Sequence, residues 1–377
     1  MRERRTRVWC GVVLGAVLCI AAAQALAEES RQTTWQNVLD AARKEGTVVV
    51  SGPPGVTQRE PIVAGWKKAF PDIAIQYTAA RGTEIVDKVV RERSANLYNW
   101  DVILASTSPT VFSLVPIHAL APLRDALILP DLADDKTWID GFAPGFMDDD
   151  KKYLYSPVGM AGEALGFVNR DCVTSTTLNK LPDLKNPELK SKIAWLDPSR
   201  PGASSRWTWI ISLVQSEDWL KDLFQHQDIT FSRDIRQITD WLVTCTKPVA
   251  IGIPNDMLQQ MQKEGLGKKV EVMVGPAYSR DINPGGAGGN ESIAWYNDAP
   301  HPNAAKVFVN WYLSHDMQQA YADSYQDNSR RVDTRPGNPD PARAMVPAVN
   351  YFNWSNEAAT RKIATLQAAI AKWGVLK

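Results

Sequence analysis

The sequence predicts an α/β protein with two lobes joined by two chain crossings. Strands and helices alternate along residues 34–108, and a second set of the same elements runs through residues 164–313. This alternation favours mostly parallel sheets with helices on both faces. The 377 residues are also enough for two lobes, each with its own hydrophobic core.

An export signal occupies residues 1–27. A start rich in arginine precedes the apolar run 8–23, and Ala25-Leu26-Ala27 has the small-x-small pattern of a cleavage site. The apolar run is shorter than the roughly 18 residues that a membrane span needs. We therefore expect cleavage after Ala27, a mature chain that begins near Glu28, and location in the periplasm.

Charge and cysteine content narrow the class of protein further. The signal holds four arginines and one glutamate of the 42 basic and 42 acidic residues, so the mature chain has 38 basic and 41 acidic side chains. That balance argues against nucleic acid as a partner, since phosphate neutralisation needs a basic excess. Cys172 and Cys245 remain after cleavage. They could form a disulfide in an oxidising compartment or stay as separate buried thiols.

The first half of the chain reads as alternating elements that begin with a helix. Thr34 can cap this helix and Gly46 can end it, and a β-branched run follows at once. The elements expected after Gly46 are the strand 47–50, the helix 62–70, the strand 74–77, the helix 84–94 and the strand 101–104.

The second half repeats the pattern. Its expected elements are the strands 164–168 and 192–196, the helix 207–224, the strands 249–252, 270–274 and 292–295, the helix 303–313 and a closing amphipathic helix 357–373. The glycines of 285–289 favour a turn or hinge, because glycine permits the torsions that a crossing needs. We expect lobe one to hold residues 28–158 and 284–377, and lobe two to hold 159–283.

Loops after the expected strands supply candidate ligand contacts. In open α/β sheets ligands lie beyond the carboxyl ends of the strands, and helix N-termini favour anions there. The alternative is that these residues are ordinary caps and turns. The candidates are Ser51, Gly52, Arg81, Ser106 and Thr107 in lobe one, and Ser204, Ser205 and Arg206 in lobe two.

Two later segments add further candidates. Asn255 or Asp256 could receive hydroxyl or amine groups of a ligand, and Arg330 or Arg331 could supply a second cation. Arginine suits this task because its planar fork pairs bidentately with carboxylate or phosphate. For every arginine the alternative is a surface residue or a structural ion pair.

Catalytic and metal-binding signatures are mostly absent. The chain has no His-Glu-x-x-His, Gly-x-Ser-x-Gly, Gly-x-x-x-x-Gly-Lys or Ser-x-x-Lys motif. None of its four histidines has metal-ligand spacing to another histidine or cysteine. His301, between two prolines, is expected to start a helix. We expect no catalytic residue, metal or cofactor.

Four stretches, taken in their order along the chain, resemble those of a known family. They are Leu39-Asp40-Ala41-Ala42-Arg43-Lys44-Glu45-Gly46-Thr47-Val48-Val49-Val50, then Gly166-Phe167-Val168-Asn169, Lys192-Ile193-Ala194-Trp195-Leu196-Asp197-Pro198 and His301-Pro302-Asn303-Ala304-Ala305-Lys306. Because these stretches follow one another in this order, the chain resembles periplasmic solute-binding proteins of bacterial ABC importers, in the branch that includes ferric-iron binders. The resemblance implies a two-lobed type II periplasmic-binding fold, a ligand in the interlobe cleft and an inner-membrane ABC permease as partner. We also expect a monomer.

One segment departs from the ferric binders of that branch. They carry adjacent tyrosines after a strand equivalent to 249–252, whereas residues 253–258 contain no tyrosine. Phenolate oxygens are hard donors suited to Fe(III), and Met257 cannot replace them. The expected ligand is therefore a small organic anion such as a phosphate ester, phosphonate or carboxylate. The alternatives are a ferric-iron transport protein, a sensory solute-binding partner of a receptor kinase, and an exported hydrolase.

Overall fold

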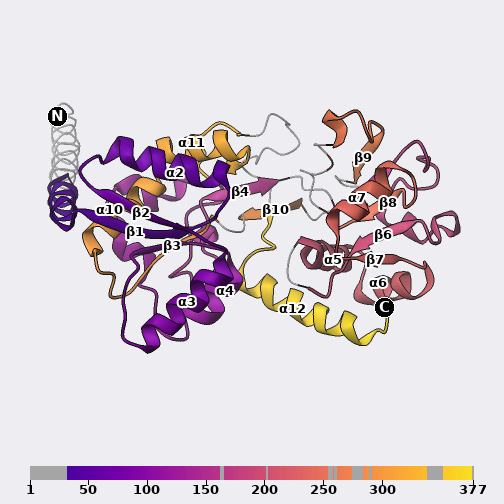
Figure 1. Ribbon diagram of the computed structural model, residues 1–377, viewed down its shortest axis with the longest axis horizontal. Coiled ribbons are helices and arrows are strands. Elements are labelled where there is room, and N and C mark those ends of the chain that lie inside the picture. The colour runs from indigo at the N-terminus through magenta and orange to yellow at the C-terminus, as the bar shows by residue number, and fades with distance from the viewer. Residues whose placement is uncertain are drawn as a thin grey trace, which may run out of the picture.

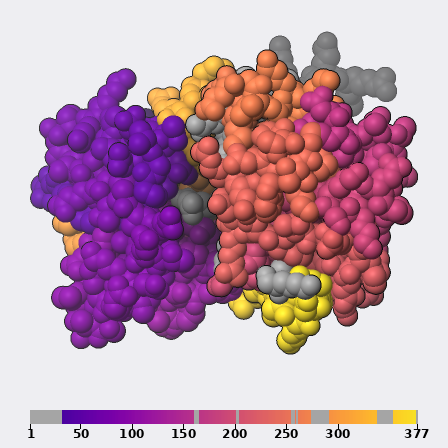
Figure 2. All heavy atoms as spheres, turned by 45° about the vertical axis from the view of Figure 1, so that its right-hand side comes forward, coloured from indigo at the N-terminus to yellow at the C-terminus, as the bar shows by residue number. Residues whose placement is uncertain are grey.

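The computed structural model describes residues 32–161, 165–200, 203–253, 258, 261–273, 283–287, 291–337 and 351–375. The expected signal, residues 1–27, lies outside the described residues. Figure 1 shows two lobes side by side, with the N-terminal half of the chain in one and most of residues 165–273 in the other. In the space-filling view they form two masses that meet along one boundary (Figure 2).

Lobe one is built on a four-stranded sheet in the order β11-β3-β1-β2. Its strands are β1 (Thr47–Gly52), β2 (Ala74–Ala79), β3 (Val102–Leu104) and β11 (Ile293–Trp295). β1 is parallel to β2 and β3, and only β11 is antiparallel. Val48 and Val50 are fully buried, as expected for a β-branched run in a sheet covered on both faces.

Helices cover both faces of this sheet. They are the helix 32–45, α2 (Val56–Ala69), α3 (Gly82–Ser94), α4 (Thr107–Leu114), α10 (Pro302–Tyr312) and α11 (His315–Tyr325). Short 3-10 turns connect α4 to the second lobe: η1 (Leu123–Ala126), η2 (Pro130–Ala133), η3 (Asp135–Thr137) and η4 (Ala143–Gly145).

Lobe two has a five-stranded sheet in the order β7-β6-β8-β5-β9. Its elements are β5 (Gly166–Asn169), η5 (Leu181–Lys185), η6 (Pro187–Leu189), β6 (Ile193–Leu196), α5 (Ala203–Val214), α6 (Glu217–His226), β7 (Thr230–Ser232), α7 (Ile235–Val243), β8 (Val249–Ile251) and β9 (Val270–Met273). β6 is parallel to β7 and β8, whereas β5 is antiparallel to β8 and β9.

The single helix expected at 207–224 is wrong, because two helices occupy that stretch. α5 ends at Val214, and the hydroxyl of Ser216 accepts the backbone N–H of Trp219 to begin α6. A serine at this position satisfies one of the free N–H groups at a helix start. The restart turns α6 away from α5 and lets both pack on the core of lobe two.

A third sheet joins the lobes. Its order is β12-β4-β10-β13, from β12 (Asn328–Ser329), β4 (Val158–Ala161), β10 (Asn283–Ala287) and β13 (Tyr351–Phe352). The two crossings pair here, because β10 runs antiparallel to β4. Gly285 and Gly286, expected in a turn, are therefore part of a paired strand.

The C-terminal helix α12 (Glu357–Lys372) packs on lobe two and not, as expected, on lobe one. The sequence placed 284–377 in lobe one, whereas Leu366 and Ile370 are buried in the hydrophobic core of lobe two. The start of α12 nevertheless touches lobe one. The backbone N–H of Glu357 donates to the carbonyl of Met147 at 2.7 Å, and its carboxylate accepts the N–H of Asp149 at 2.9 Å.

Two acidic side chains of lobe one, Asp101 and Glu45, form hydrogen bonds with the start of α10. His301 precedes the helix, as expected, and both its backbone N–H and its ring Nδ1 lie within 2.9 Å of the buried carboxylate of Asp101. The carboxylate of Glu45 accepts the backbone N–H groups of Asn303 at 3.2 Å and Ala304 at 2.7 Å. A negative charge at a helix N-terminus satisfies free donors and complements the helix dipole.

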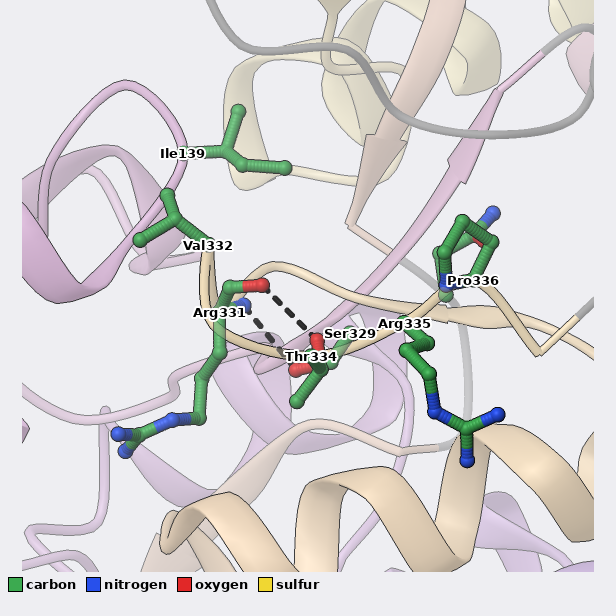
Figure 3. Close-up of a pocket in the computed structure, with 8 residues that line it drawn as sticks. Ile139, Ser329, Arg331, Val332, Thr334, Arg335 and Pro336 are labelled. Carbon is green, nitrogen blue, oxygen red and sulfur yellow. Dashed lines mark hydrogen bonds between the residues drawn. The ribbon is translucent and has the colours of Figure 1, made fainter.

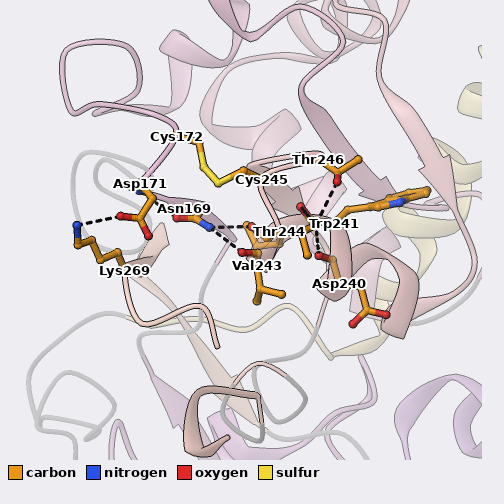
Figure 4. Close-up of a disulfide and its surroundings, with 11 residues drawn as sticks. Asn169, Asp171, Cys172, Asp240, Trp241, Val243, Thr244, Cys245, Thr246 and Lys269 are labelled. Atoms are coloured by element: carbon orange, nitrogen blue, oxygen red, sulfur yellow. Dashed lines mark hydrogen bonds and ion pairs between the residues drawn. A yellow bond between two sulfur atoms is a disulfide. The ribbon is translucent and has the colours of Figure 1, made fainter. Parts of the chain in front are cut away.

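Cys172 and Cys245 form a disulfide. Cys172 and Cys245, with Cα atoms 6.1 Å apart, connect the turn after β5 to the turn after α7 (Figure 4). Of the two states left open by the sequence, the structure has the bridge. It closes a loop with a sequence separation of 73 residues within lobe two.

We predict that Glu45→Ala lowers the free energy of unfolding by about 1–2 kcal/mol, because two helix N–H groups lose a charged acceptor. Urea denaturation of the mature protein measures the change. Glu60→Ala is the control, since Glu60 is an exposed glutamate of α2. Equal midpoints for the two variants would contradict a stabilising cap.

Replacing both cysteines by alanine is expected to lower the free energy of unfolding by up to roughly 4 kcal/mol, because the unfolded chain loses the constraint of a long loop. Denaturation of the variant and of wild type provides the comparison. Thiol titration of denatured, unreduced mature protein should find no free thiol. Two titratable thiols would rule out the disulfide.

Candidate functional site

The carboxyl ends of the lobe-one strands carry five of the predicted site residues. Ser51 is fully buried near the end of β1 and lies against the phenol of Tyr296. Thr107 begins α4 after β3, and the backbone N–H of Ala105 donates to the carbonyl of Ser292, at the start of β11. The last residues of β1 and β3 therefore lie at one edge with the residue that precedes β11.

Buried hydroxyl groups lie at this edge without a partner. The side-chain oxygens of Thr107, Thr110 and Ser292 are buried, and none forms a hydrogen bond within the described part of the chain. An unpaired buried polar group costs about 1–3 kcal/mol relative to a paired one. Such groups call for a further partner, such as an ordered water or a bound molecule.

Gly52 has no room for a side chain. A Cβ atom there would lie 2.3 Å from the hydroxyl of Tyr77, which in turn donates to the carbonyl of Pro53 at 3.0 Å. Burial raises the pKa of Tyr77 above its ordinary value, so its hydroxyl stays protonated. Gly52 thus lets the Tyr77 ring close the end of β1, which the sequence did not reveal.

Arg81 and Ser106 precede the first turns of α3 and α4. Arg81 is exposed, and Ser106 is half-buried. A Cβ at Gly82 would lie 3.4 Å from the side chains of both Ala105 and Pro109, so the two helix starts are close together. The positive dipole ends of both helices favour an anion at this edge, and at α3 the carboxylate of Glu84 already accepts the backbone N–H of Arg81 at 3.4 Å.

In lobe two, Ser204 and Ser205 are buried in the first turn of α5. The hydroxyl of Ser204 donates to the carbonyl of Leu196 at the end of β6. A Cβ at Gly252, directly after β8, would approach the Ser204 hydroxyl to 2.6 Å. These contacts place the start of α5 at the carboxyl ends of β6 and β8, as the sequence predicted.

Asp197, which the sequence did not single out, lies at the same edge of lobe two. Its carboxylate accepts Ser199 N–H at 2.9 Å and the guanidinium of Arg233 at 2.9 Å. Burial alone would raise the pKa of Asp197, but these hydrogen bonds outweigh it and hold the pKa below its ordinary value. Asp197 is therefore an ionised, paired carboxylate.

Arg206, also in the first turns of α5, lies against two indoles. Its guanidinium carbon is 5.1 Å from the ring centre of Trp207 and 5.5 Å from that of Trp354, which precedes α12. Stacking on aromatic faces restrains a guanidinium without using its N–H donors. Trp207 and Trp209 belong to the core of lobe two and Trp219 packs against it.

Arg330 and Arg331 do not join these residues. Arg330 is buried and donates to the carbonyls of Ile139 and Gly141. Arg331 is buried, forms ion pairs with Asp131 at 3.1 Å and Asp333 at 2.8 Å, and donates to the carbonyl of Leu313. Both match the alternative of structural arginines.

A small pocket of about 160 Å³ lies beside Arg331 in lobe one. Figure 3 shows the guanidinium of Arg331 extending away from Thr334 and Pro336, which line the pocket with it. The lining also includes Arg335, Ile139 and Val332, and Arg331 is its one residue among the predicted ligand contacts. It lies apart from the strand ends that hold Ser51 and Ser204.

Asn255 and Asp256 lie outside the described residues. Within the described ranges, no group of three or more histidine, cysteine, aspartate or glutamate side chains is placed to hold a metal ion. Among the same residues, no helix has both the length and the apolar character required to cross a membrane.

Comparison with solved structures finds proteins of similar fold at low sequence identity. Iron-bound HitA from Pseudomonas aeruginosa has a TM-score of 0.60 and 15% identity, over 86% of this chain and 99% of that one. Apo FutA2 from Synechocystis PCC6803 has a TM-score of 0.64 and 15% identity, over 88% and 99%. AfuA from Actinobacillus pleuropneumoniae, with exogenous fructose-6-phosphate bound, has 0.56 and 15%, over 87% and 99%.

These likenesses confirm the predicted two-lobed periplasmic-binding fold. Comparison with curated proteins finds no match. Residues 51–319, well over half of the chain, match the family model for the bacterial extracellular solute-binding protein. By this match, and in agreement with the resemblance in its sequence, the chain belongs to the bacterial extracellular solute-binding proteins.

Proposed function

We propose that this protein is the periplasmic receptor of an ABC importer and that it holds a small organic anion between its lobes. The observation that carries the proposal is the group of buried, unpartnered hydroxyls beside two helix N-termini at the edge of lobe one. Hydroxyl and helix N–H donors, with a guanidinium opposite, form a set that an anion satisfies and a cation does not.

The proposed contacts differ slightly from those expected. Ser51, Gly52, Arg81, Ser106 and Thr107 remain on the lobe-one side, and Thr110 and Ser292 join them. Ser204, Ser205 and Arg206 remain on the lobe-two side, and Asn255 and Asp256 stay candidates for hydroxyl or amine groups. We leave out Arg330 and Arg331. Arg331 has carbonyl and carboxylate partners in lobe one. The Nη2 of Arg330 donates to two backbone carbonyls, and its Nη1, which has no hydrogen-bond partner among the described residues, lies against the buried phenol of Tyr155.

A receptor with these contacts works by closure. The ligand contacts both lobes, so it binds the closed arrangement more tightly and shifts the population toward it. The closed form is the one that a membrane permease would receive. In this proposal the protein is a monomer with no reaction of its own and no cofactor. Nearby permease and ATPase genes would favour transport over the sensory role.

Ferric-ion transport is the second candidate, because HitA, one of the structurally similar proteins, is iron-bound. The absence of tyrosines from residues 253–258 argues against it.

A thermal-shift screen of the mature protein tests the ligand class. The panel contains phosphorylated sugars, phosphonates, carboxylates, amines and ferric citrate. A ligand at a hundred times its dissociation constant adds about 2.7 kcal/mol to the free energy of unfolding, which raises the melting temperature measurably. We expect stabilisation by anions. Stabilisation by ferric salts alone, or by cationic solutes, would contradict the proposed anion.

Substitutions locate the anion. Arg81→Ala and Arg206→Ala should each weaken anion binding about ten- to a hundredfold, because each removes a charge-assisted contact. Arg236→Ala is the control, since Arg236 is exposed on α7 and pairs only with Asp240 within its own helix. Equal affinities for all three variants would place the anion elsewhere.

Export is tested separately. We predict that signal peptidase cleaves after Ala27, because the tripartite start of the chain is typical of a signal peptide. Mass spectrometry of the protein from the periplasmic fraction should identify Glu28 as the first residue. A periplasmic form that retains residues 2–27 would contradict the prediction.

A further inference from the structure

The neighbourhood of Arg206 contains two N–H donors that have no acceptor among the described residues. The Nε of Arg206 and the Nε1 of Trp354 are both buried and have no hydrogen-bond partner among the described residues. The indole of Trp354 is 1% exposed, so water does not satisfy it from outside. Both groups only donate, and a single acceptor atom or acceptor group can receive both.

The guanidinium of Arg206 lies beside the ring of Trp354. The Arg206 guanidinium carbon lies 5.5 Å from the ring centre of Trp354, and the rings of Trp354 and Trp207 are 5.4 Å apart in an edge-on arrangement. Stacking restrains the guanidinium plane while leaving its N–H groups free to donate. Trp207 and Trp354 thus hold Arg206 in a fixed orientation.

The position of Trp354 ties this group to the junction of the lobes. Trp354 follows β13 of the connecting sheet and precedes α12, whose first residue bonds to Met147 in lobe one. Arg206 comes from α5 in lobe two. In Figure 1, α12 begins beside α4 of lobe one and runs below α5 and α6 of lobe two.

Packing alone does not account for this arrangement. A phenylalanine or leucine at position 354 would fill a hydrophobic core without burying an N–H group that lacks an acceptor. Burying such a donor costs free energy that an apolar residue avoids. Elsewhere in the same protein, the indoles of Trp66, Trp138, Trp195 and Trp295 all donate to an oxygen atom.

We propose that Trp354 and Arg206 form a subsite for a carboxylate or phosphoryl oxygen of the bound solute. Trp354 donates its indole N–H to that oxygen and also positions Arg206 by stacking. The subsite deepens the proposed function, since it rests on an anionic solute. It adds the C-terminal segment before α12 to the residues that recognise the solute.

The test compares two substitutions that each remove one indole N–H. Trp354→Phe removes an unpaired donor, whereas Trp295→Phe removes a donor that bonds to the carbonyl of Pro122 at 3.0 Å in lobe one. Calorimetric titration of the mature protein with inorganic phosphate and with citrate measures affinity. Thermal melting without these anions measures stability.

We expect opposite outcomes for the two variants. Trp354→Phe should weaken binding of the anion that wild type binds by about tenfold, with a melting temperature above that of Trp295→Phe. Trp295→Phe should lower the melting temperature and keep the wild-type affinity. Arg206→Lys, which keeps the charge but loses the planar fork, should also bind about tenfold more weakly.

The measurements distinguish failure of the subsite from failure of the proposed anion receptor. If wild type binds an anion and Trp354→Phe binds it equally well, the subsite is overturned while the anion receptor stands. If wild type binds neither phosphate nor citrate nor any other anion of the screen, the subsite and the proposed function both fail. If Trp354→Phe loses both stability and affinity to the same degree as Trp354→Leu, the indole is structural and the subsite is overturned.

Discussion

The antiparallel pairing of β4 with β10 is the constraint on which the rest of the architecture depends. Each strand is a crossing between the lobes, and a crossing without the other would leave one edge of its backbone N–H and C=O groups unpaired. Pairing Met160 with Gly286 satisfies these groups in the one place where both crossings run. The lobes are consequently joined by a short sheet, which bends and twists more easily than it slides, and this favours hinge closure over shear.

The C-terminal segment adds a third link that shares this constraint. β13 pairs with β10, so residues 351–352 extend the connecting sheet, and α12 then leaves it along lobe two. Glu357 holds the start of the helix to Met147 and Asp149 of lobe one, and Arg361 lies over the ring of Phe112 in α4. Any change in the angle between the lobes must therefore be absorbed at the first turn of α12, close to Trp354.

Local sequence patterns predicted the elements whose signals are local. The β-branched run at 47–50 and the helix before it needed no long-range information, but Thr34, expected as the helix cap, lies inside the helix 32–45. The break between α5 and α6 was missed, because Ser216 is an ordinary polar residue until its cap geometry is known. The glycines at 285 and 286 suggested a turn, but the partner strand 158–161 lies more than a hundred residues earlier, so their pairing is not readable from the sequence.

In the candidate site, too, residues with a local signal could be predicted, and residues that depend on distant partners could not. Ser51, near the end of β1, and Ser204, in the first turn of the helix after β6, were placed at this edge from the sequence, because parallel strands bring their carboxyl ends together. Arg331 looked equally suitable, yet its partner Asp131 is 200 positions away and fixes it as a structural cation. Trp354 could not be predicted from the sequence, because its proposed role depends on contact with Arg206, which is far away along the chain.

Unpaired donors also explain how such a site could discriminate between solutes. Each buried hydroxyl or N–H without a partner lowers the stability of the empty protein, and a ligand oxygen that receives it recovers that free energy. A solute of the same shape without the oxygen leaves the donor unpaired and gains nothing. A site built to hydrogen-bond a solute group can reject the analogue that lacks it by roughly 10⁴-fold or more, whereas apolar fit separates analogues by only about 10- to 200-fold per methylene. Thr107, Thr110 and Ser292 on one lobe, and Arg206 with Trp354 beside the other, place such groups on both sides of the hinge. A solute that satisfies both sets favours the closed arrangement, so the atoms that confer specificity also drive the closure.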